Sequence, residues 1–257
     1  MEWIKNFFRI LWRLWFYVFF GLSVLLMLPF LLILTSREAY YPFLYKIIRL
    51  FSKSLIFFMG FRLSIEVEEP LDRGKSYMFC PNHTSMLDPF ILISMVPNPI
   101  VFVGKAELSK IPIFGFFYKK VCILVDRSSP QSRREVYMKA KNRLQGGTSV
   151  AIFPEGLVPT EDIVLSPFKN GAFSLAIEHQ IPIVPALYFD CKRLFSWTIF
   201  KGAPGVLRVK QYASIPTKGM EKKQTAGLKT RLYESLYLEL VKDKAYMKDT
   251  QRMKSNE

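Results

Sequence analysis

The chain has 257 residues, half of them hydrophobic, which is enough for one domain with a sizeable core and an additional segment. Its formal net charge of +15 predicts a polyanionic partner, such as nucleic acid, an anionic membrane surface or a phosphorylated substrate. The three cysteines, Cys80, Cys122 and Cys191, lack metal-ligand spacing and their odd number excludes a complete disulfide framework, so we expect buried thiols in a reducing compartment.

The first predicted element is an apolar helix near the N-terminus. Residues 14–34 contain no charged side chain, and this run has the length needed to cross a bilayer core. It is too long for a secretory signal and no small-residue cleavage site follows it. Trp12, Trp15 and Tyr17 at one end are typical of residues at a membrane interface. The pattern leaves open whether this helix spans the bilayer or returns within one leaflet.

A second apolar stretch covers residues 40–61, with Lys46, Arg49 and Lys53 at helical spacing. This amphipathic pattern predicts a helix that lies in the interface. Residues 1–60 are therefore expected to form a membrane-anchoring helical pair that contacts membrane lipids. This anchor, together with the absence of a recognised binding motif, argues against nucleic acid as the partner of the basic chain.

From residue 62 onward, strand and helix patterns alternate. Strands are predicted at 63–67, 77–80, 100–103, 121–125, 149–153, 183–189 and 206–215. Helices are predicted after Asp88 and at 132–145, 171–179 and 221–242, the last followed by a solvated basic tail. This alternation predicts an α/β fold whose central, mostly parallel sheet is flanked by helices. We assign residues 61–257 to this catalytic domain and residues 1–60 to the anchor.

Four predicted strands are followed by polar residues whose side chains could take part in catalysis or binding. The strands at 77–80, 100–103, 121–125 and 149–153 lead to His83, Lys105, Arg127 and Glu155 respectively. Ligand sites in open α/β sheets gather at the carboxyl ends of the strands. Any one of these residues is explained by a chain leaving the core, but four together predict a site.

His83 and Asp88 are the candidate catalytic pair. A histidine with a pKa near neutral can take a proton from a hydroxyl, and a carboxylate can orient it and stabilise the imidazolium. Residues five apart on one helix face different directions, so we expect His83 in a loop folded over Asp88 in the first turn of the following helix. Thr84 or Ser85 is the predicted N-cap. A polar turn with a structural histidine is the alternative interpretation.

The sequence resembles the glycerolipid acyltransferase family in four blocks that follow the family's order. These are residues 82–88 with His83 and Asp88, residues 104–115 beginning at Gly104-Lys105-Ala106-Glu107, residues 153–156, and residues 181–186. The resemblance covers residues 76–190. It implies transfer of a fatty acyl group from a thioester donor, acyl-CoA or acyl-carrier protein, to the hydroxyl of a lysolipid, without a metal or other cofactor. The leading acceptor is 1-acylglycerol-3-phosphate, which would give phosphatidic acid.

The resemblance also implies roles for individual residues. His83 would act as general base, oriented by Asp88, and no Gly-x-Ser-x-Gly motif offers a serine nucleophile. The predicted substrate-binding residues are Asn82, Lys105, Glu107, Arg127, Glu155, Gly156 and Lys169. The enzyme would be membrane-associated, with its catalytic domain on the cytoplasmic side of the inner or plasma membrane. The segment 110–120, in which aromatic residues lie between lysines, is interpreted as a further membrane contact, with a core segment as the alternative.

The chain departs from the family after Gly156. The family continues there with threonine and a phosphate-binding arginine, whereas this chain has Leu157 and Val158, with Glu161 and Asp162 close behind. The acceptor could therefore be an amino-acid-containing lysolipid. Two other classes stay open, a thioester hydrolase and a non-catalytic protein that binds anionic lipid.

Overall fold

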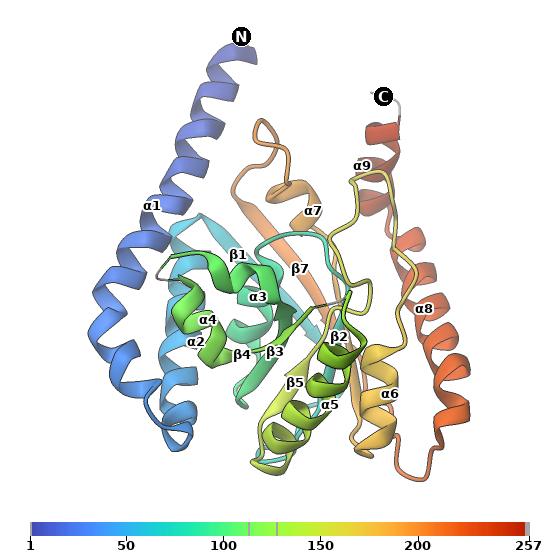
Figure 1. The fold of residues 1–257 in the computed structure, drawn as a ribbon. Helices are drawn as coiled ribbons and strands as arrows, with labels where there is room; N and C mark the ends of the chain where they lie inside the picture. Colours follow the sequence, from blue (N-terminus) through green and yellow to red (C-terminus); the bar gives the residue numbers. More distant parts are fainter. Residues whose placement is uncertain (1, 113, 127, 255–257) are drawn as a thin grey trace.

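The structure is a computed structural model that describes residues 2–112, 114–126 and 128–254. Its centre is a seven-stranded sheet in the order β1-β7-β6-β2-β5-β3-β4 (Figure 1). The strands are β1 (Phe61–Val67), β2 (Met78–Pro81), β3 (Ile100–Lys105), β4 (Cys122–Val125), β5 (Ser149–Ala151), β6 (Ile183–Tyr188) and β7 (Gly205–Gln211). All neighbouring pairs are parallel except β6 and β7, which are antiparallel. The predicted α/β fold is confirmed.

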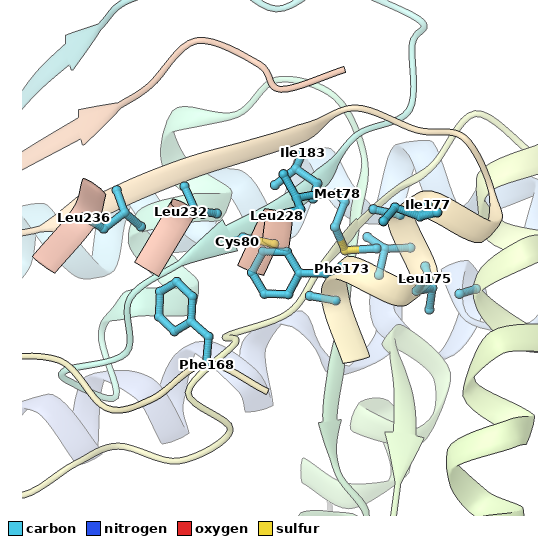
Figure 2. Packing of buried hydrophobic residues seen from close by; sticks show 14 of the residues in the cluster. Met78, Cys80, Phe168, Phe173, Leu175, Ile177, Ile183, Leu228, Leu232 and Leu236 are labelled. Atoms are coloured by element: carbon cyan, nitrogen blue, oxygen red, sulfur yellow. The ribbon is translucent and has the colours of Figure 1, made fainter. Parts of the chain in front are cut away.

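The two faces of the sheet are covered by different helices because side chains alternate along each strand. On β2, Met78 and Cys80 point into a core formed with α5 (Pro130–Gln145), α6 (Gly171–Glu178) and α8 (Thr225–Lys242). Figure 2 shows Leu228, Leu232 and Leu236 in a row along α8 in this core. Tyr77 and Phe79 point to the other face, where α2 (Tyr41–Phe58) and α3 (Asp88–Met95) lie. Strands buried on both faces explain the continuous apolar runs in the sequence.

The remaining helices complete the chain. They are α1 (Glu2–Leu34), α4 (Phe114–Val121), α7 (Cys191–Leu194) and α9 (Lys244–Lys254), with short 3-10 turns at Glu38–Tyr40, Ala106–Lys110 and Lys222–Gln224. Cys80 and Cys191 are buried and Cys122 is partly buried, all as free thiols. Burial raises the pKa of all three thiols, which keeps them protonated and unreactive.

Helix α1 is the only helix in the described residues that is long and apolar enough to cross a membrane, judged by length and composition. One side of it is exposed and carries large apolar residues such as Trp3, Phe8 and Leu26. The other side packs on the domain through Phe16 and Leu31, both buried. Helix α1 therefore runs along the surface of the domain, and contact of its exposed side with a membrane stays a prediction.

The second helix of the predicted pair differs from expectation. Helix α2 is amphipathic, but Leu44, Leu55 and Ile56 are buried in the core that it shares with α1, α3 and β1. The hydroxyl of Tyr45 donates to the carbonyl oxygen of Val96, 2.9 Å away. Part of the apolar surface of α2 therefore faces protein, while Phe43, Leu50, Phe57 and Phe58 are exposed, so contact of α2 with the membrane interface stays a prediction. The predicted boundary at residue 60 thus separates segments that share one core, and the division into anchor and catalytic domain stays a functional prediction.

Two further expectations need correction. The tail after α8 forms a further helix, α9, which buries Tyr246 and Thr250, and the Asp243 carboxylate accepts from the Tyr246 amide at 2.8 Å. The seventh strand ends at Gln211 rather than at residue 215, and the amides of Ala213 and Ser214 donate to the carboxylates of Glu68 and Glu69.

The segment 110–120 divides its side chains between core and surface. Phe117 of α4 is buried with Leu31 and Leu44, whereas Phe116 and Ile111 are exposed. The alternative of a core segment therefore holds for one side of α4, and membrane contact by the other side stays a prediction.

Candidate active site

His83 and Asp88 lie at the carboxyl end of β2, as their spacing predicts. His83 is in the loop between β2 and α3, and Asp88 is the first residue of α3. The imidazole Nδ1 is 2.8 Å from the Asp88 Oδ2. The Asp88 side chain is fully buried, whereas that of His83 is 19% exposed. A buried carboxylate therefore holds a histidine that solvent can still reach.

The Asp88 carboxylate also organises the loop that carries the histidine. Its Oδ2 accepts from the backbone amides of Thr84 (2.6 Å) and Ser85 (2.8 Å). The predicted N-cap is wrong, because Leu87 occupies that position in α3. The Ser85 hydroxyl is instead engaged elsewhere, donating to the carbonyl oxygen of Phe195 at 2.8 Å and accepting from the Leu87 amide at 3.2 Å.

These contacts define what the His83 ring can do. An ionised carboxylate can only accept a hydrogen bond, so the ring nitrogen that faces it must carry a proton. The hydrogen-bond network therefore assigns the proton to Nδ1 and leaves the lone pair on Nε2. The ring stacks on Phe153 with centroids 4.0 Å apart and planes 17° apart. Its orientation is therefore set on two sides, and Nε2 is the nitrogen able to accept a proton from a substrate.

Glu155 braces the histidine loop from a second segment. One carboxyl oxygen accepts from the His83 amide at 2.7 Å and the other from the Ser166 amide at 2.9 Å. The residue is buried, and burial raises the pKa of its carboxyl to about 7, against the opposing effect of the two amides. Glu155 thus joins the His83 loop to the segment 156–166, and both of its oxygens face backbone.

The buried Glu155 predicts a pH dependence of stability. Its pKa is raised on folding from 4.5 to about 7, so its contribution to the free energy of unfolding is fully present below 4.5 and is lost as the pH rises through 7. We expect this loss to amount to about 3 kcal/mol. Chemical denaturation of wild type and Glu155→Gln between pH 4.5 and 8 measures it as the difference between the two proteins. If the free energy of unfolding changed with pH in the same way in both proteins, the raised pKa of Glu155 would be contradicted.

Asn82 connects two strands of the sheet next to the His83 loop. It is fully buried, and its amide oxygen accepts from the Tyr188 amide at 2.7 Å while its nitrogen donates to the Tyr188 carbonyl at 3.2 Å. The side chain extends the pairing of β2 with β6 beyond Pro81. In the structure Asn82 thus bridges the ends of β2 and β6, and its contact with substrate stays a prediction.

The candidate cations lie at the end of β3 and in the segment between β5 and α6. Lys105 ends β3, is exposed, and its Nζ is 3.5 Å from a carboxylate oxygen of Glu107. The Lys169 side chain lies over Gly156, with its Nζ 3.0 Å from the position that a Cβ on Gly156 would take. Gly156 has φ +76°, which favours glycine. Arg127 lies outside the described residues.

The acids that follow Gly156 prove to have partners within the protein. Glu161 accepts from the Lys201 ammonium and from the Thr198 hydroxyl, each at 3.0 Å. Asp162 also has an interaction partner. The negative charge of Glu161 is therefore balanced within the protein and is not directed at a ligand.

Sequence reasoning missed residues that support the site from a distance. The buried ammonium of Lys192 donates to the carbonyl oxygen of Ile163, and burial lowers its pKa to about 8. The Tyr246 hydroxyl donates to the Val164 carbonyl oxygen at 2.7 Å. Both hold the segment that presents the Ser166 amide to Glu155. No local pattern identifies such contacts, because their partners are far away in the sequence.

An apolar cleft of about 640 Å³ opens beside the histidine. Phe153, whose ring stacks on His83, is part of its wall, and Gly156 and Lys169 also line it. Its other walls are mainly apolar, including Val103, Val125, Val136, Ile152 and Leu175. The cleft therefore combines an apolar interior with a cation and reaches Phe153, the ring on which the candidate base stacks.

Comparisons with known proteins point to one family. The family model described as "Acyltransferase" matches residues 62–188. The 1-acyl-sn-glycerol-3-phosphate acyltransferase beta of Homo sapiens is 28% identical over 176 residues, covering 68% of this chain and 63% of that protein. The 1-acyl-sn-glycerol-3-phosphate acyltransferase of Saccharomyces cerevisiae is 32% identical over 141 residues, covering 54% of this chain and 46% of that protein. The chain thus spans less than two thirds of the length of these relatives.

A solved structure shares the fold. The crystal structure of the 1-acyl-sn-glycerophosphate (LPA) acyltransferase PlsC from Thermotoga maritima superimposes with a TM-score of 0.69 at 23% identity. The match covers 92% of this chain and 98% of that chain. It therefore includes the sheet and most of the surrounding helices.

Proposed function

Because residues 62–188 form a domain of the acyltransferase family, we propose that this chain transfers a fatty acyl group from a thioester donor to the free hydroxyl of a lysolipid. The observation that carries the proposal is the His83 ring, held by Asp88 through Nδ1 at 2.8 Å with Nε2 left to accept a proton. A lipid hydroxyl becomes an effective nucleophile when its proton is removed during attack.

The proposed reaction proceeds without a covalent acyl-enzyme. Nε2 of His83 takes the proton as the acceptor oxygen forms a bond to the thioester carbonyl carbon. Asp88 stabilises the resulting imidazolium. The tetrahedral intermediate then collapses, the carbon–sulfur bond breaks, and the thiolate of the donor takes the proton from Nε2. The nearby Ser85 hydroxyl is buried and donates to Phe195, which supports a route through direct attack by the acceptor.

We propose 1-acylglycerol-3-phosphate as the acceptor and phosphatidic acid as the product. Lys105 and Lys169 are exposed cations at the ends of β3 and of the segment after β5. A lysine is a suitable point-charge partner for a phosphomonoester. Because Glu161 is balanced by Lys201, the argument for an amine-bearing acceptor loses its main support. The acyl chain would occupy the apolar cleft beside Phe153.

The proposed location follows from the same features. The exposed apolar side of α1 supports attachment to membrane lipids. Three free thiols suit a reducing compartment, which supports a catalytic domain on the cytoplasmic side of the inner or plasma membrane. Acyl-CoA and acyl-carrier protein present the same thioester, and both are candidate donors.

The direct test is an assay of the purified full chain with an acyl thioester and a panel of lysolipids, with products identified by mass spectrometry. Formation of phosphatidic acid from 1-acylglycerol-3-phosphate is the expected result. Release of free fatty acid without any need for a lysolipid would instead identify a thioester hydrolase. Transfer that is faster to amino-acid-containing lysolipids would overturn the proposed acceptor.

The two lysines should discriminate between acceptors. We expect Lys105→Ala and Lys169→Ala each to lower kcat/KM for 1-acylglycerol-3-phosphate by ~10- to 100-fold, since a charge-assisted contact with phosphate is lost. The rate with a phosphate-free monoacylglycerol should change little. Lys222→Ala, an exposed lysine far along the chain, controls for the loss of one charge. Equal losses on both acceptors would show that the lysines do not bind phosphate.

A further inference from the structure

The loop between α7 and β7 carries three large apolar side chains on its surface. Trp197, Ile199 and Phe200 are 53%, 57% and 50% exposed. The Lys201 amide donates to the Thr198 carbonyl oxygen at 3.0 Å, which closes a tight turn with Ile199 and Phe200 at its two central positions. Such positions usually hold glycine, proline, asparagine or aspartate. An isoleucine and a phenylalanine there are out of place on a surface that faces only water.

The base of this loop is held firmly by polar contacts. The Ala203 amide donates to the Leu194 carbonyl oxygen at 3.1 Å and closes the loop. The buried Arg13 of α1 donates to the carbonyl oxygens of Thr198 (3.0 Å) and Lys201 (2.8 Å), and also to that of Ser196. The apolar tip is therefore presented on a rigid support, so little conformational freedom remains to be lost on binding.

The same contacts hold the loop against the packed side of the N-terminal half of α1. Arg13 belongs to the N-terminal half of α1, where Phe7, Phe8 and Leu14 are exposed. The loop and this half of α1 lie at the same end of the molecule, toward the top of Figure 1. The loop tip thus lies at the same end of the molecule as the exposed apolar side chains of a helix that is itself suited to a membrane.

We infer that residues 197–200 are a second lipid-contacting element, which inserts into the same bilayer interface as α1. The inference rests on the membrane association in the proposed function. An indole, a phenyl ring and an aliphatic side chain are the groups that enter the headgroup and upper acyl region of a bilayer. The position of the loop at the same end of the molecule as the exposed apolar residues of α1, together with the net charge of +15, favours an anionic bilayer as the occupant rather than a protein partner.

The loop also connects this contact to the histidine. Glu161 accepts from the Thr198 hydroxyl and the Lys201 ammonium at the loop base. Glu161 lies between Gly156 and Ser166, in the segment that Glu155 joins to the His83 amide. Insertion of the tip would therefore set the depth of His83 relative to the headgroups, where the hydroxyl of a lysolipid lies.

The first test measures insertion without any activity. The full chain with Phe200→Cys carries an environment-sensitive fluorophore and is mixed with vesicles of phosphatidylcholine and phosphatidylglycerol. We expect a blue shift and quenching by lipids with a spin label in the upper acyl chain. Lys223→Cys, at an exposed position in the turn before α8, is the matched control and should show neither, and the parent chain treated with the same label gives the background. Equal access of aqueous iodide to both labels would overturn the inference.

The second test concerns catalysis at the membrane. The triple variant Trp197→Ser, Ile199→Ser, Phe200→Ser should lose ~10-fold or more in rate on a long-chain acceptor in vesicles, because apolar burial in lipid is lost. Its rate on a short-chain, water-soluble acceptor should match wild type. The double variant Met138→Ser, Leu238→Ser removes exposed apolar residues elsewhere and should behave as wild type. Equal losses on both acceptors, or no loss on either, would overturn the inference. A wild-type chain that transfers acyl groups to neither acceptor would refute the proposed function and leave the labelling result valid.

Discussion

His83→Ala is expected to lower the rate of acyl transfer by ~100- to 10,000-fold, the usual cost of removing a general base. Nε2 is the nitrogen that the hydrogen bond from Nδ1 to Asp88 leaves available to the acceptor hydroxyl. Rates of the purified variant under saturating donor and acceptor measure the effect. Because the ring also stacks on Phe153, thermal unfolding must be measured in parallel.

The chain offers a matched control for this variant. His179, the other histidine, follows α6 and is remote in sequence from the catalytic loop. We expect His179→Ala to retain turnover close to wild type. Near-native turnover of a folded His83→Ala protein would rule out His83 as the base and with it the proposed mechanism.

Asp88→Asn should have an effect of similar size for a different reason. The Oδ2 of Asp88 accepts three hydrogen bonds, from the His83 ring and from the amides of Thr84 and Ser85. An asparagine oxygen can take over these contacts, but it is neutral and cannot stabilise the imidazolium. We expect the rate to fall ~100- to 10,000-fold, measured as kcat with thermal unfolding as the control for folding.

A comparison of two substitutions separates the two functions of this carboxylate. Asp88→Asn can keep the geometry of the loop, whereas Asp88→Ala leaves the amides of Thr84 and Ser85 buried without a partner. We therefore expect Asp88→Ala to be destabilised by ~1–3 kcal/mol relative to Asp88→Asn. A rate for Asp88→Asn within a few-fold of wild type would show that the charge of Asp88 does not contribute to catalysis.

The parts of the site that the sequence predicts are those whose contacts are local. His83 and Asp88 lie five residues apart, so the turn before α3 brings them together with no help from distant segments. The amide of His83 and the carboxylate of Glu155 meet from positions 72 residues apart, and Asn82 meets Tyr188 from positions 106 residues apart. These contacts depend on the order of the strands, which no local pattern encodes.

The same distinction holds for the fold. The buried strands are predicted because each one is a local apolar run, as in β2 and β6. The antiparallel direction of β7 and the position of β1 at the sheet edge arise from pairing between distant segments. Helix α9 lies in a mostly polar sequence in which Tyr246 and Thr250 are buried, so no local apolar pattern predicts it. The packing of α2 on α1 and α3 is not predicted because an amphipathic helix looks the same whether protein or lipid covers it.

The Arg13 contact also constrains the order in which the chain can fold. Helix α1 precedes the loop after α7 in the chain, yet the Nη2 of its buried guanidinium donates to carbonyl oxygens 183 to 188 residues later. A buried cation without partners is strongly unfavourable, so the docking of α1 must wait until the loop after α7 has formed. Contacts of such sequence separation form slowly. Helix α1 is therefore expected to be among the last elements to reach its final place, although it precedes every strand of the sheet in the chain.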